Sequence, residues 1–438
     1  MEKKLRRTEI KKPFFVVLFI ILISLVGIYF TTPLQGIIFY RLIIFCILIL
    51  LVCWVWTFFS IRGFSIKREA RGLRQEVGEV FEERFEVKNN LRFTRPWIEI
   101  RDISNLPESK GSRVISWIGP ESLRSYSAYT LLSRRGLYNL GPTLLCSGDP
   151  FGLFSRVREI PCEKSLLVLP YMVEIDKFPF PSGMLPGGRA KRKKTFEVTP
   201  HAASVRDYIH GDPISRIHWA SSARRDRLIS KEFDQDPMAD VWILLDGQKA
   251  AHYRSPDALY TSSVKKFWLN QVEFIKEARG YRLPTDTFEY AVASAASISK
   301  FAIKSGLALG FLCLGQKLMM LSPEKGERQL NKVLETLALV QPHGKQPLRV
   351  VIESQAPNFL RGSTIIIITA SISDQLISIV DSLIRRNIHP LVILISPQSF
   401  GFEEISERIV GQIRVRGVPT TIISKDNDIR LELENGYY

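Results

Sequence analysis

The sequence has few of the residues that build disulfide frameworks, zinc sites or nucleotide-binding loops. It holds five cysteines in 438 residues, and no two of them form a CxxC pair, so neither a disulfide-stapled fold nor a structural zinc site is expected. No GxxxxGK[ST] loop and no GxGxxG turn after a strand is present, which argues against ATP hydrolysis by this chain. No GxSxG turn frames a nucleophilic serine, and that excludes the common hydrolase signature.

The positive charge is unevenly distributed. Lys and Arg number 60 against 44 Asp and Glu, for a net charge of +16. Residues 1–12 and 62–74 each carry a net charge of +4, and residues 189–194 carry +5. The first two segments flank the most hydrophobic part of the chain, which is typical of membrane proteins. The remaining surface is nearly neutral, so a nucleic-acid partner is not expected.

Two long apolar runs lie near the N-terminus, at residues 14–30 and 42–59. At about 1.5 Å of rise per residue, each comes close to the ~30 Å hydrocarbon core of a bilayer. The connection between them has one cation, Arg41, so the positive-inside rule places both ends of the hairpin in the cytoplasm. We expect a multi-pass protein of the inner (cytoplasmic) membrane. A signal peptide is the alternative for the first run, but no small-residue cleavage site follows it.

The chain after the apolar runs changes its pattern at about residue 239. Before that point, short alternating segments separated by turn residues predict an antiparallel β-sandwich. After it, strands and amphipathic helices alternate, and continuous apolar strands such as residues 365–368 are typical of a covered parallel sheet. The predicted fold class is α+β multidomain, with a two-helix membrane hairpin, an antiparallel β-sandwich and a doubly wound α/β domain. The predicted parts are a basic cytoplasmic tail (1–12), two transmembrane helices (13–60), the β-sandwich (63–170), a linker with a signature segment (171–238), the α/β domain (239–425) and a tail (426–438).

The most unusual stretch, here called the signature segment, is residues 207–228 with the sequence DYIHGDPISRIHWASSARRDRL. Asp212 before Pro213 predicts a helix N-cap, a helix over residues 214–224 and a strand over residues 228–233. The candidate binding residues of this segment are Asp207, Tyr208, Gly211, Asp212, His218, Trp219, Ser222, Arg224 and Arg225.

The predicted helix has apolar side chains that can pack on a core and arginines that are left at its surface. Ile214, Ile217 and Trp219 are expected to attach the helix to a core, which leaves a cluster of arginines. Arg224 and Arg225 either grip a carboxylate or phosphate in bidentate contacts or form an interdomain salt-bridge network. Both interpretations stay open at the level of the sequence.

Two further motifs precede the signature segment: RRGLYNLGP at residues 134–142, and DPFGLF at residues 149–154, which is expected to form a tight turn that buries two aromatic rings. The three motifs, in this order, resemble the bacterial family called domain of unknown function 58 over residues 64–425. Two membrane spans before the first motif are usual in that family.

The resemblance implies that the α/β domain is similar to a von Willebrand factor type A domain, which often binds a divalent cation through an Asp-x-Ser-x-Ser motif. Here that position reads DGQKA at residues 246–250, so only Asp246 remains of the motif, and Lys249 adds a positive charge. Residues 285–287 and Thr369 could supply further oxygens, but a hard cation needs several converging on it. We therefore predict no metal and no other cofactor, with Asp246 as a degenerate cation position.

Families similar to this one are commonly encoded beside MoxR-type AAA+ ATPases and transglutaminase-like membrane proteins. The resemblance therefore implies a non-enzymatic, cytoplasm-facing adaptor that works with a MoxR-type AAA+ ATPase in envelope protein assembly or maturation. A transglutaminase-like membrane protein and membrane lipids are the other expected partners. Two alternatives remain: a membrane-bound hydrolase using His218, Ser221 and Ser222, and an anionic-lipid or nucleic-acid binder using residues 189–194.

Overall fold

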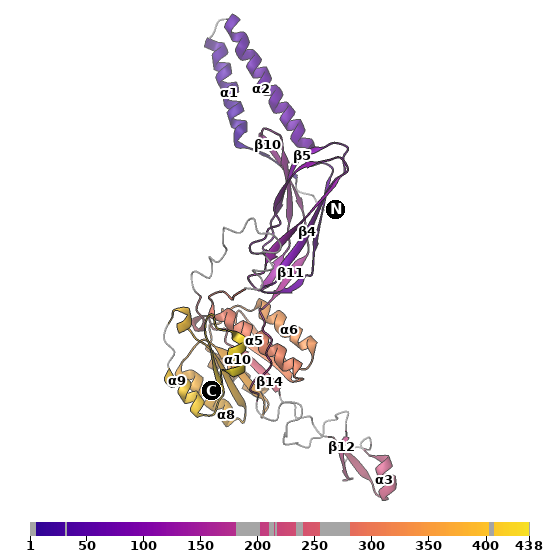
Figure 1. Cartoon of the computed structure of the whole chain (residues 1–438), viewed down its shortest axis with the longest axis vertical. Helices are drawn as coiled ribbons and strands as arrows, with labels where there is room; N and C mark the ends of the chain where they lie inside the picture. The colour runs from indigo at the N-terminus through magenta and orange to yellow at the C-terminus, as the bar shows by residue number, and fades with distance from the viewer. Residues whose placement is uncertain are drawn as a thin grey trace. The chain divides into compact units, whose positions relative to one another are not determined.

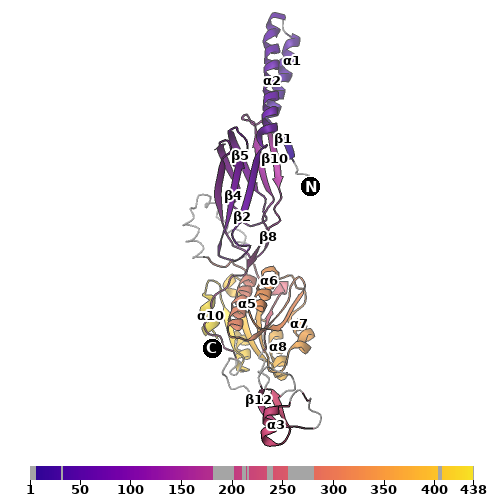
Figure 2. The same cartoon turned by 90° about the vertical axis from the view of Figure 1, so that its right-hand side faces the viewer.

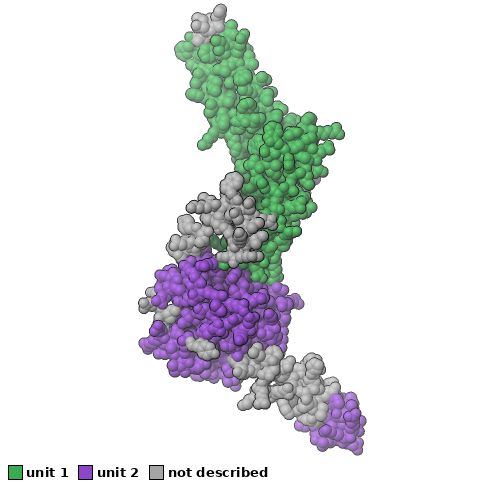
Figure 3. All heavy atoms as spheres, in the orientation of Figure 1, with its two compact units in different colours: residues 1–169, 262–281 green, residues 170–261, 282–438 purple. Residues whose placement is uncertain are grey.

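The computed structural model describes residues 6–30, 33–180, 202–209, 214, 217–233, 240–254, 281–402 and 407–437. The chain divides into two compact units (Figure 3). The first comprises residues 1–169 and 262–281, and the second comprises residues 170–261 and 282–438. The first holds two apolar helices and three β-sheets, and the second holds the signature segment and a six-stranded sheet (Figure 1).

Two long apolar helices open the first unit. Helix α1 spans Lys12–Phe30 and α2 spans Pro33–Ser60, and both are long and apolar enough to cross a membrane. The helices pack on each other, and a Cβ at Gly27 would come within 2.8 Å of the Phe39 ring. The predicted pair of apolar helices is therefore confirmed.

The strands of the first unit form three sheets, two of them antiparallel throughout (Figure 2). One sheet consists of β2 (Phe64–Ala70), β4 (Val80–Asn89) and β7 (Leu123–Leu131). A second, in the order β1-β10-β9-β5-β6, consists of β1 (Arg6–Ile10), β5 (Arg95–Asp102), β6 (Arg113–Ile118), β9 (Thr143–Gly148) and β10 (Phe154–Ile160). The third consists of β3 (Arg74–Glu76), β11 (Ser165–Leu169) and β8 (Gly136–Asn139), with β3 parallel to β11.

Alternating burial explains how the first two sheets pack. In β4 the residues that share one face, including Phe85 and Val87, are fully buried, as the period of two in a strand requires. They form a single core with residues of the second sheet such as Ile98, Ile100 and Leu145. The predicted antiparallel β-structure in this part of the chain is thus present.

Strand β1 is a feature that the sequence analysis did not predict. Residues 6–10 belong to the segment predicted to be a basic tail, yet they pair antiparallel with β10 in the register Arg6↔Arg158 to Ile10↔Phe154. Helix α1 follows β1 closely, and β2 follows α2 closely. Both ends of the helix pair therefore enter the same set of sheets.

The second unit is built on a mixed sheet in the order β16-β15-β14-β17-β18-β19. Its parallel strands are β14 (Asp240–Leu245), β15 (Ala308–Leu314), β17 (Thr364–Thr369), β18 (His389–Ile395) and β19 (Thr420–Ile423). The edge strand β16 (Leu318–Glu324) is antiparallel. The chain starts at β14, extends to one side and then returns to extend to the other, which is the doubly wound order.

The parallel strands are connected through the helices α5 (Thr287–Lys304), α6 (Glu327–Leu339), α7 (Leu348–Gln355), α8 (Asp374–Arg385) and α9 (Glu407–Val415), and α10 (Ile429–Asn435) follows the last strand. Trp242 and Leu244 of β14 share a core with α7, α8 and α9, while α5 contacts β14, β15, β17 and β18. The central strands β14, β17 and β18 are mostly apolar and almost fully buried because helices pack against the sheet, as predicted.

The predicted linker and the predicted C-terminal tail both contain buried core residues. Phe178 and Phe180, in the predicted linker, stack near Phe301 of α5 at centroid distances of 6.2 and 6.0 Å. The predicted C-terminal tail contains α10, whose Ile429 and Leu433 are buried. These segments extend the α/β unit beyond the predicted bounds of 239 and 425, because their apolar residues complete its core.

Candidate functional site

The described part of the signature segment lies between two paired strands. Strand β12 (Ala202–Asp207) pairs antiparallel with β13 (Ile229–Phe233), and α3 (Trp219–Arg225) lies between them in the chain. The predicted helix start at residue 214 is wrong: Ile217 forms a β-bridge with Ser230, and the helix begins at Trp219. Because Ile217 belongs to this short extended stretch, its backbone is not free to be helical.

His218, rather than an aspartate, caps α3. Its Nδ1 accepts a hydrogen bond of 3.1 Å from the Ser221 backbone N–H and lies 2.7 Å from the Ser221 hydroxyl oxygen. The Ser222 hydroxyl donates to the His218 carbonyl oxygen at 3.1 Å and accepts from the Ile229 N–H at 2.9 Å. Ser222 therefore ties the first turn of α3 to β13, and its hydroxyl is occupied by the backbone.

Of the three residues expected to anchor the helix to a core, one is buried and two are exposed. Ile217 is buried, whereas Ile214 and Trp219 are 72% and 63% exposed. Trp219 is therefore a surface residue, and the prediction that it anchors the helix to a core is wrong. A short helix capped on a two-stranded ribbon has too little core to cover an indole.

The arginines of the signature segment also lie at the surface. Arg227 forms an ion pair of 3.0 Å with Asp207, while Tyr208 donates its backbone N–H to the Leu228 carbonyl. Arg224 and Arg225 are exposed in the last turn of α3, and neither is ion-paired with an acid in the described ranges. No salt-bridge network involving these two is seen there.

Several predicted site residues lie outside the described residues. They are Gly211, Asp212 and the basic run at residues 189–194. The residues that the structure does bring together in the signature segment are Asp207, Tyr208, His218, Trp219, Ser222, Arg224 and Arg225, all within β12, α3 and their flanks.

The other two motifs lie in the first unit and form parts of its sheets and turns. The RRGLYNLGP motif contains β8, which pairs with β11. The DPFGLF motif forms the turn between β9 and β10, where Leu153 and Phe154 are buried. The expectation that this turn buries two aromatic rings is only half right, because Phe151 is 66% exposed.

A polar cluster lies at the carboxyl ends of β14 and β17. The Asp246 carboxylate accepts a hydrogen bond of 2.7 Å from the Thr369 hydroxyl and one of 3.0 Å from the Gln248 N–H. The His252 Nε2 lies 2.7 Å from the Asp246 carbonyl oxygen, as a donor to it. Burial lowers the pKa of His252, although the nearby Asp246 opposes that shift, so the imidazole is held neutral.

This donor set does not fit the divalent cation that the resemblance suggests. Asp246 is 2% exposed, and both of its carboxylate oxygens are already bonded to neutral donors. Asp286, within the 285–287 stretch expected to supply further oxygens, accepts from the Phe288 N–H as the N-cap of α5, and its carboxylate lies 3.5 Å from the Arg254 guanidinium. Among the residues that the structure describes, no three acidic, histidine or cysteine side chains converge on a point. A hard cation needs more free oxygens than this cluster offers.

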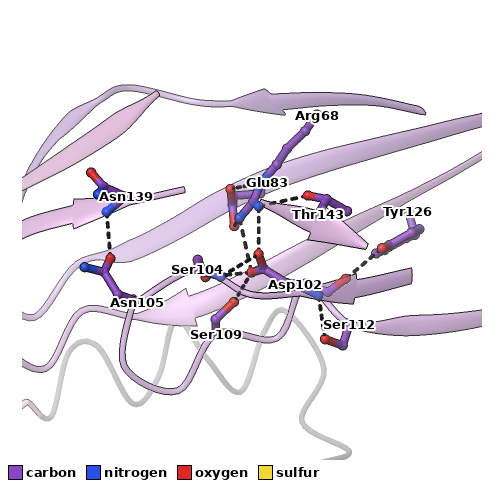
Figure 4. Close-up of polar contacts among 11 residues, drawn as sticks. Arg68, Glu83, Asp102, Ser104, Asn105, Ser109, Ser112, Tyr126, Asn139 and Thr143 are labelled. Atoms are coloured by element: carbon purple, nitrogen blue, oxygen red, sulfur yellow. Dashed lines mark hydrogen bonds and ion pairs between the residues drawn. The ribbon is translucent and has the colours of Figure 1, made fainter. Parts of the chain in front are cut away.

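A second buried charged cluster, which the sequence analysis missed, lies inside the first unit (Figure 4). The Arg68 guanidinium donates to Glu83 at 2.8 Å and to Asp102 at 2.7 Å, and all three side chains are almost fully buried. Ser104 and Ser109 donate further hydrogen bonds to Asp102. The cluster joins β2 and β4 to β5 and is closed to solvent, so its role is structural. The sequence signal that could have indicated it is the charged Arg68 at a position that shares its strand face with Ile66 and Ala70.

Comparison with known proteins agrees with the expected resemblance. The model of a family described as "Protein of unknown function DUF58" matches residues 204–267. The chain is 20% identical over 332 residues, 74% of each protein, to "Uncharacterized protein YeaD" of Bacillus subtilis (strain 168). A solved structure, the CARDB domain of the PF1109 protein in complex with di-metal ions from Pyrococcus furiosus, covers 24% of this chain and 91% of its own at 15% identity. Its TM-score of 0.17 is too low to inform the fold.

Proposed function

We propose, from the premise that the chain is a DUF58 family protein, that it is a membrane-anchored, cytoplasm-facing adaptor whose signature segment binds a protein partner. The observation that carries this proposal is the exposure of Trp219, Arg224 and Arg225 on one short helix. Trp and Arg are the residues most enriched at the energetic centres of protein interfaces.

The polar residues around α3 support binding rather than catalysis. His218 caps the helix, and Ser222 holds the helix to β13, so these side chains keep the surface in shape. Ile209 and Leu228 are exposed near the ends of the two strands. A surface that combines apolar side chains with exposed guanidinium groups is suited to a partner with an apolar site and nearby carboxylates.

The membrane anchor is supported by the arrangement of the first unit. Because β1 precedes α1 and β2 follows α2 within one set of sheets, both ends of a spanning pair lie on the same side of the bilayer. Lys11, Lys12 and Arg62 flank that side, and the positive-inside rule assigns it to the cytoplasm. We propose the inner membrane as the location.

We also propose that the α/β unit is von Willebrand factor type A-like and binds without a metal. The doubly wound strand order supports this, and the Asp246 cluster has the chemistry of a hydrogen-bonded cap on the sheet. Binding would then use the loops at the carboxyl ends of the strands. The proposed partners are a MoxR-type AAA+ ATPase and a transglutaminase-like membrane protein, in envelope protein assembly or maturation.

The experiment is affinity purification of the tagged full-length protein from its native membrane, with partners identified by mass spectrometry. The test variant is Arg224→Ala/Arg225→Ala, and the matched control is Arg385→Ala/Arg386→Ala, another exposed arginine pair at the end of a helix in the same unit. An AAA+ ATPase that is recovered with the native and control proteins but lost from the test variant supports the adaptor. Absence of any such ATPase under nucleotide-trapped conditions contradicts it.

A second function, a membrane-bound hydrolase, is favoured by one observation. The Ser221 hydroxyl lies 2.7 Å from His218 Nδ1, which is the distance of a nucleophile from its base. The same nitrogen accepts from the Ser221 N–H, however, so helix capping competes for its lone pair. Hydrolysis of ester or peptide substrates that is lost in both Ser221→Ala and His218→Ala, with partner binding kept, would establish this alternative.

A further inference from the structure

We infer that the DPFGLF turn between β9 and β10 is a third membrane-contacting element and that Phe151 at its tip inserts into the lipid interface beside α1. The inference rests on the proposed anchoring by α1 and α2, and it assigns the bilayer itself as the partner of this surface.

The turn is held in a fixed shape by one buried carboxylate. Asp149 is 2% exposed, and it accepts hydrogen bonds from the backbone N–H groups of Phe151 at 2.9 Å, Leu153 at 3.2 Å and Phe154 at 2.6 Å. Gly152 adopts a φ of +70°, which favours glycine. The tip is therefore presented as a rigid projection.

The base of this turn is attached to the two apolar helices. Leu153 and Phe154 are buried in a cluster with Phe14 and Val17 of α1 and with residues of α2. The Phe14 and Phe154 rings lie 5.5 Å apart, and the Lys11 N–H donates to the Leu153 carbonyl oxygen at 2.9 Å. The turn thus lies beside the first two turns of α1.

This contact determines the depth of the tip. Lys12 is the last cation before the apolar part of α1, and Val17 lies about 8 Å beyond it along the helix axis. Gly27 of α1 lies against the Phe39 ring of α2. Phe14 and Val52 are equally many residues away from this contact along their helices, so they lie at about the same depth along the helix pair. Trp54 and Trp56, which follow, are both exposed, and exposed tryptophans near the end of a span mark the membrane interface.

The tip has the chemistry of an interfacial element. Phe151 is mostly exposed and its neighbours Pro150 and Gly152 are exposed too, so the described parts of the chain leave most of the ring uncovered. Transfer of such a ring from water into the boundary between headgroups and acyl chains is favourable. Lys12 and Arg62 at the same end of the helices complement anionic headgroups.

Photo-crosslinking of the full-length protein in its native membrane tests the inference. Benzoylphenylalanine is placed at position 151, at position 15 as a lipid-exposed reference in α1, and at position 137 as a control. Phe15 and Leu137 are both exposed apolar residues, and Leu137 lies in β8, in a different sheet from the turn. After irradiation, phospholipid adducts are identified by mass spectrometry.

We expect lipid adducts at positions 151 and 15 and none at position 137. Adducts at position 15 without any at position 151 would overturn the inference while leaving the membrane anchor intact. Absence of adducts at both positions would overturn the anchor as well. Adducts of equal yield at all three positions would overturn the inference, because labelling would then be unselective.

Discussion

Glu83 and Asp102 in the first unit and Asp246 in the second are buried carboxylates with different kinds of partner. The first two share the guanidinium of Arg68, whereas Asp246 is bonded to a hydroxyl and a backbone N–H. Breaking a buried ion pair leaves an uncompensated charge, while removing a neutral donor leaves one unsatisfied oxygen. The comparison teaches that similar burial can hide very different sensitivities to mutation.

The two acids of the ion cluster are themselves unequal. Burial raises the pKa of Glu83, and Arg68 only partly opposes this. Burial also disfavours ionised Asp102, but hydrogen bonds from Ser109 and Arg68 outweigh it and lower the pKa of Asp102. As the pH falls, Glu83 is therefore the first of the two acids to accept a proton.

The largest expected effect is that of Arg68→Met. We expect it to destabilise the first unit by about 3 to 5 kcal/mol, because two buried carboxylates lose their cation. Hydrogen exchange of the full-length protein, followed by mass spectrometry, reports the opening of β2 and β4 separately from that of β14 and β17. The latter strands should keep their protection; equal losses in both units would contradict the comparison.

Glu83→Gln is the control for that prediction. It keeps a hydrogen-bonding side chain of the same shape and removes the carboxylate that more readily takes up a proton. The loss of protection in β2 and β4 should be far smaller than for Arg68→Met. A loss of similar size would show that packing, rather than charge, holds the cluster.

An intermediate effect is expected for Thr369→Val in the second unit. Valine matches threonine in shape but leaves one Asp246 oxygen without its donor, at a cost of about 1 to 3 kcal/mol. Exchange should accelerate in β14 and β17 and stay unchanged in β2 and β4. Thr369→Ser, which keeps the hydroxyl, should recover most of the protection, and a failure to do so would point to the methyl group instead.

The smallest effect is a pH dependence of the second unit. Burial lowers the pKa of His252. As the pH falls below about 6.5, the His252 imidazole therefore binds a proton in the unfolded chain but stays neutral in the folded chain. The free energy of unfolding should then fall with decreasing pH, by at most about 1.4 kcal/mol per pH unit.

Hydrogen exchange at pH 7 and pH 5.5, corrected for intrinsic amide rates, checks this dependence. His252→Gln should flatten the slope for β14 and β17. His389→Gln is the matched control, because His389 is exposed at the start of β18. A slope that survives His252→Gln would assign the dependence to another group.

Periodicity was sufficient to predict the regular elements of both units. The short alternating segments expected before residue 239 are present as antiparallel strands such as β4 and β6, and the apolar run at residues 365–368 lies within β17, because each has a continuous or alternating apolar pattern. Strand β1 was missed because its residues, RRTEI, have no apolar face. Its pairing depends on β10, far away in the sequence, and no local pattern carries that information.

The signature segment shows where local rules stop. Asp-Pro is a strong helix-start signal, yet the helix begins after His218, because the bridge between Ile217 and Ser230 extends the backbone first. The exposure of Trp219 could not be predicted either, since burial depends on how much core the rest of the unit supplies. The buried Arg68 cluster was missed for the same reason: an alternating strand reveals which positions point inward but not whether acids from other strands meet there.

Strand β1 also sets the order in which the chain can assemble. A ribosome completes β1 first, then both apolar helices and most of the sheets, and only then β10, its pairing partner. Strand β1 therefore stays without its partner until β10 has been made, and its docking then closes this edge of the sheet. A bulky fusion placed directly ahead of Arg6 would hinder that closing step, whereas one attached behind α10 would leave it unimpeded.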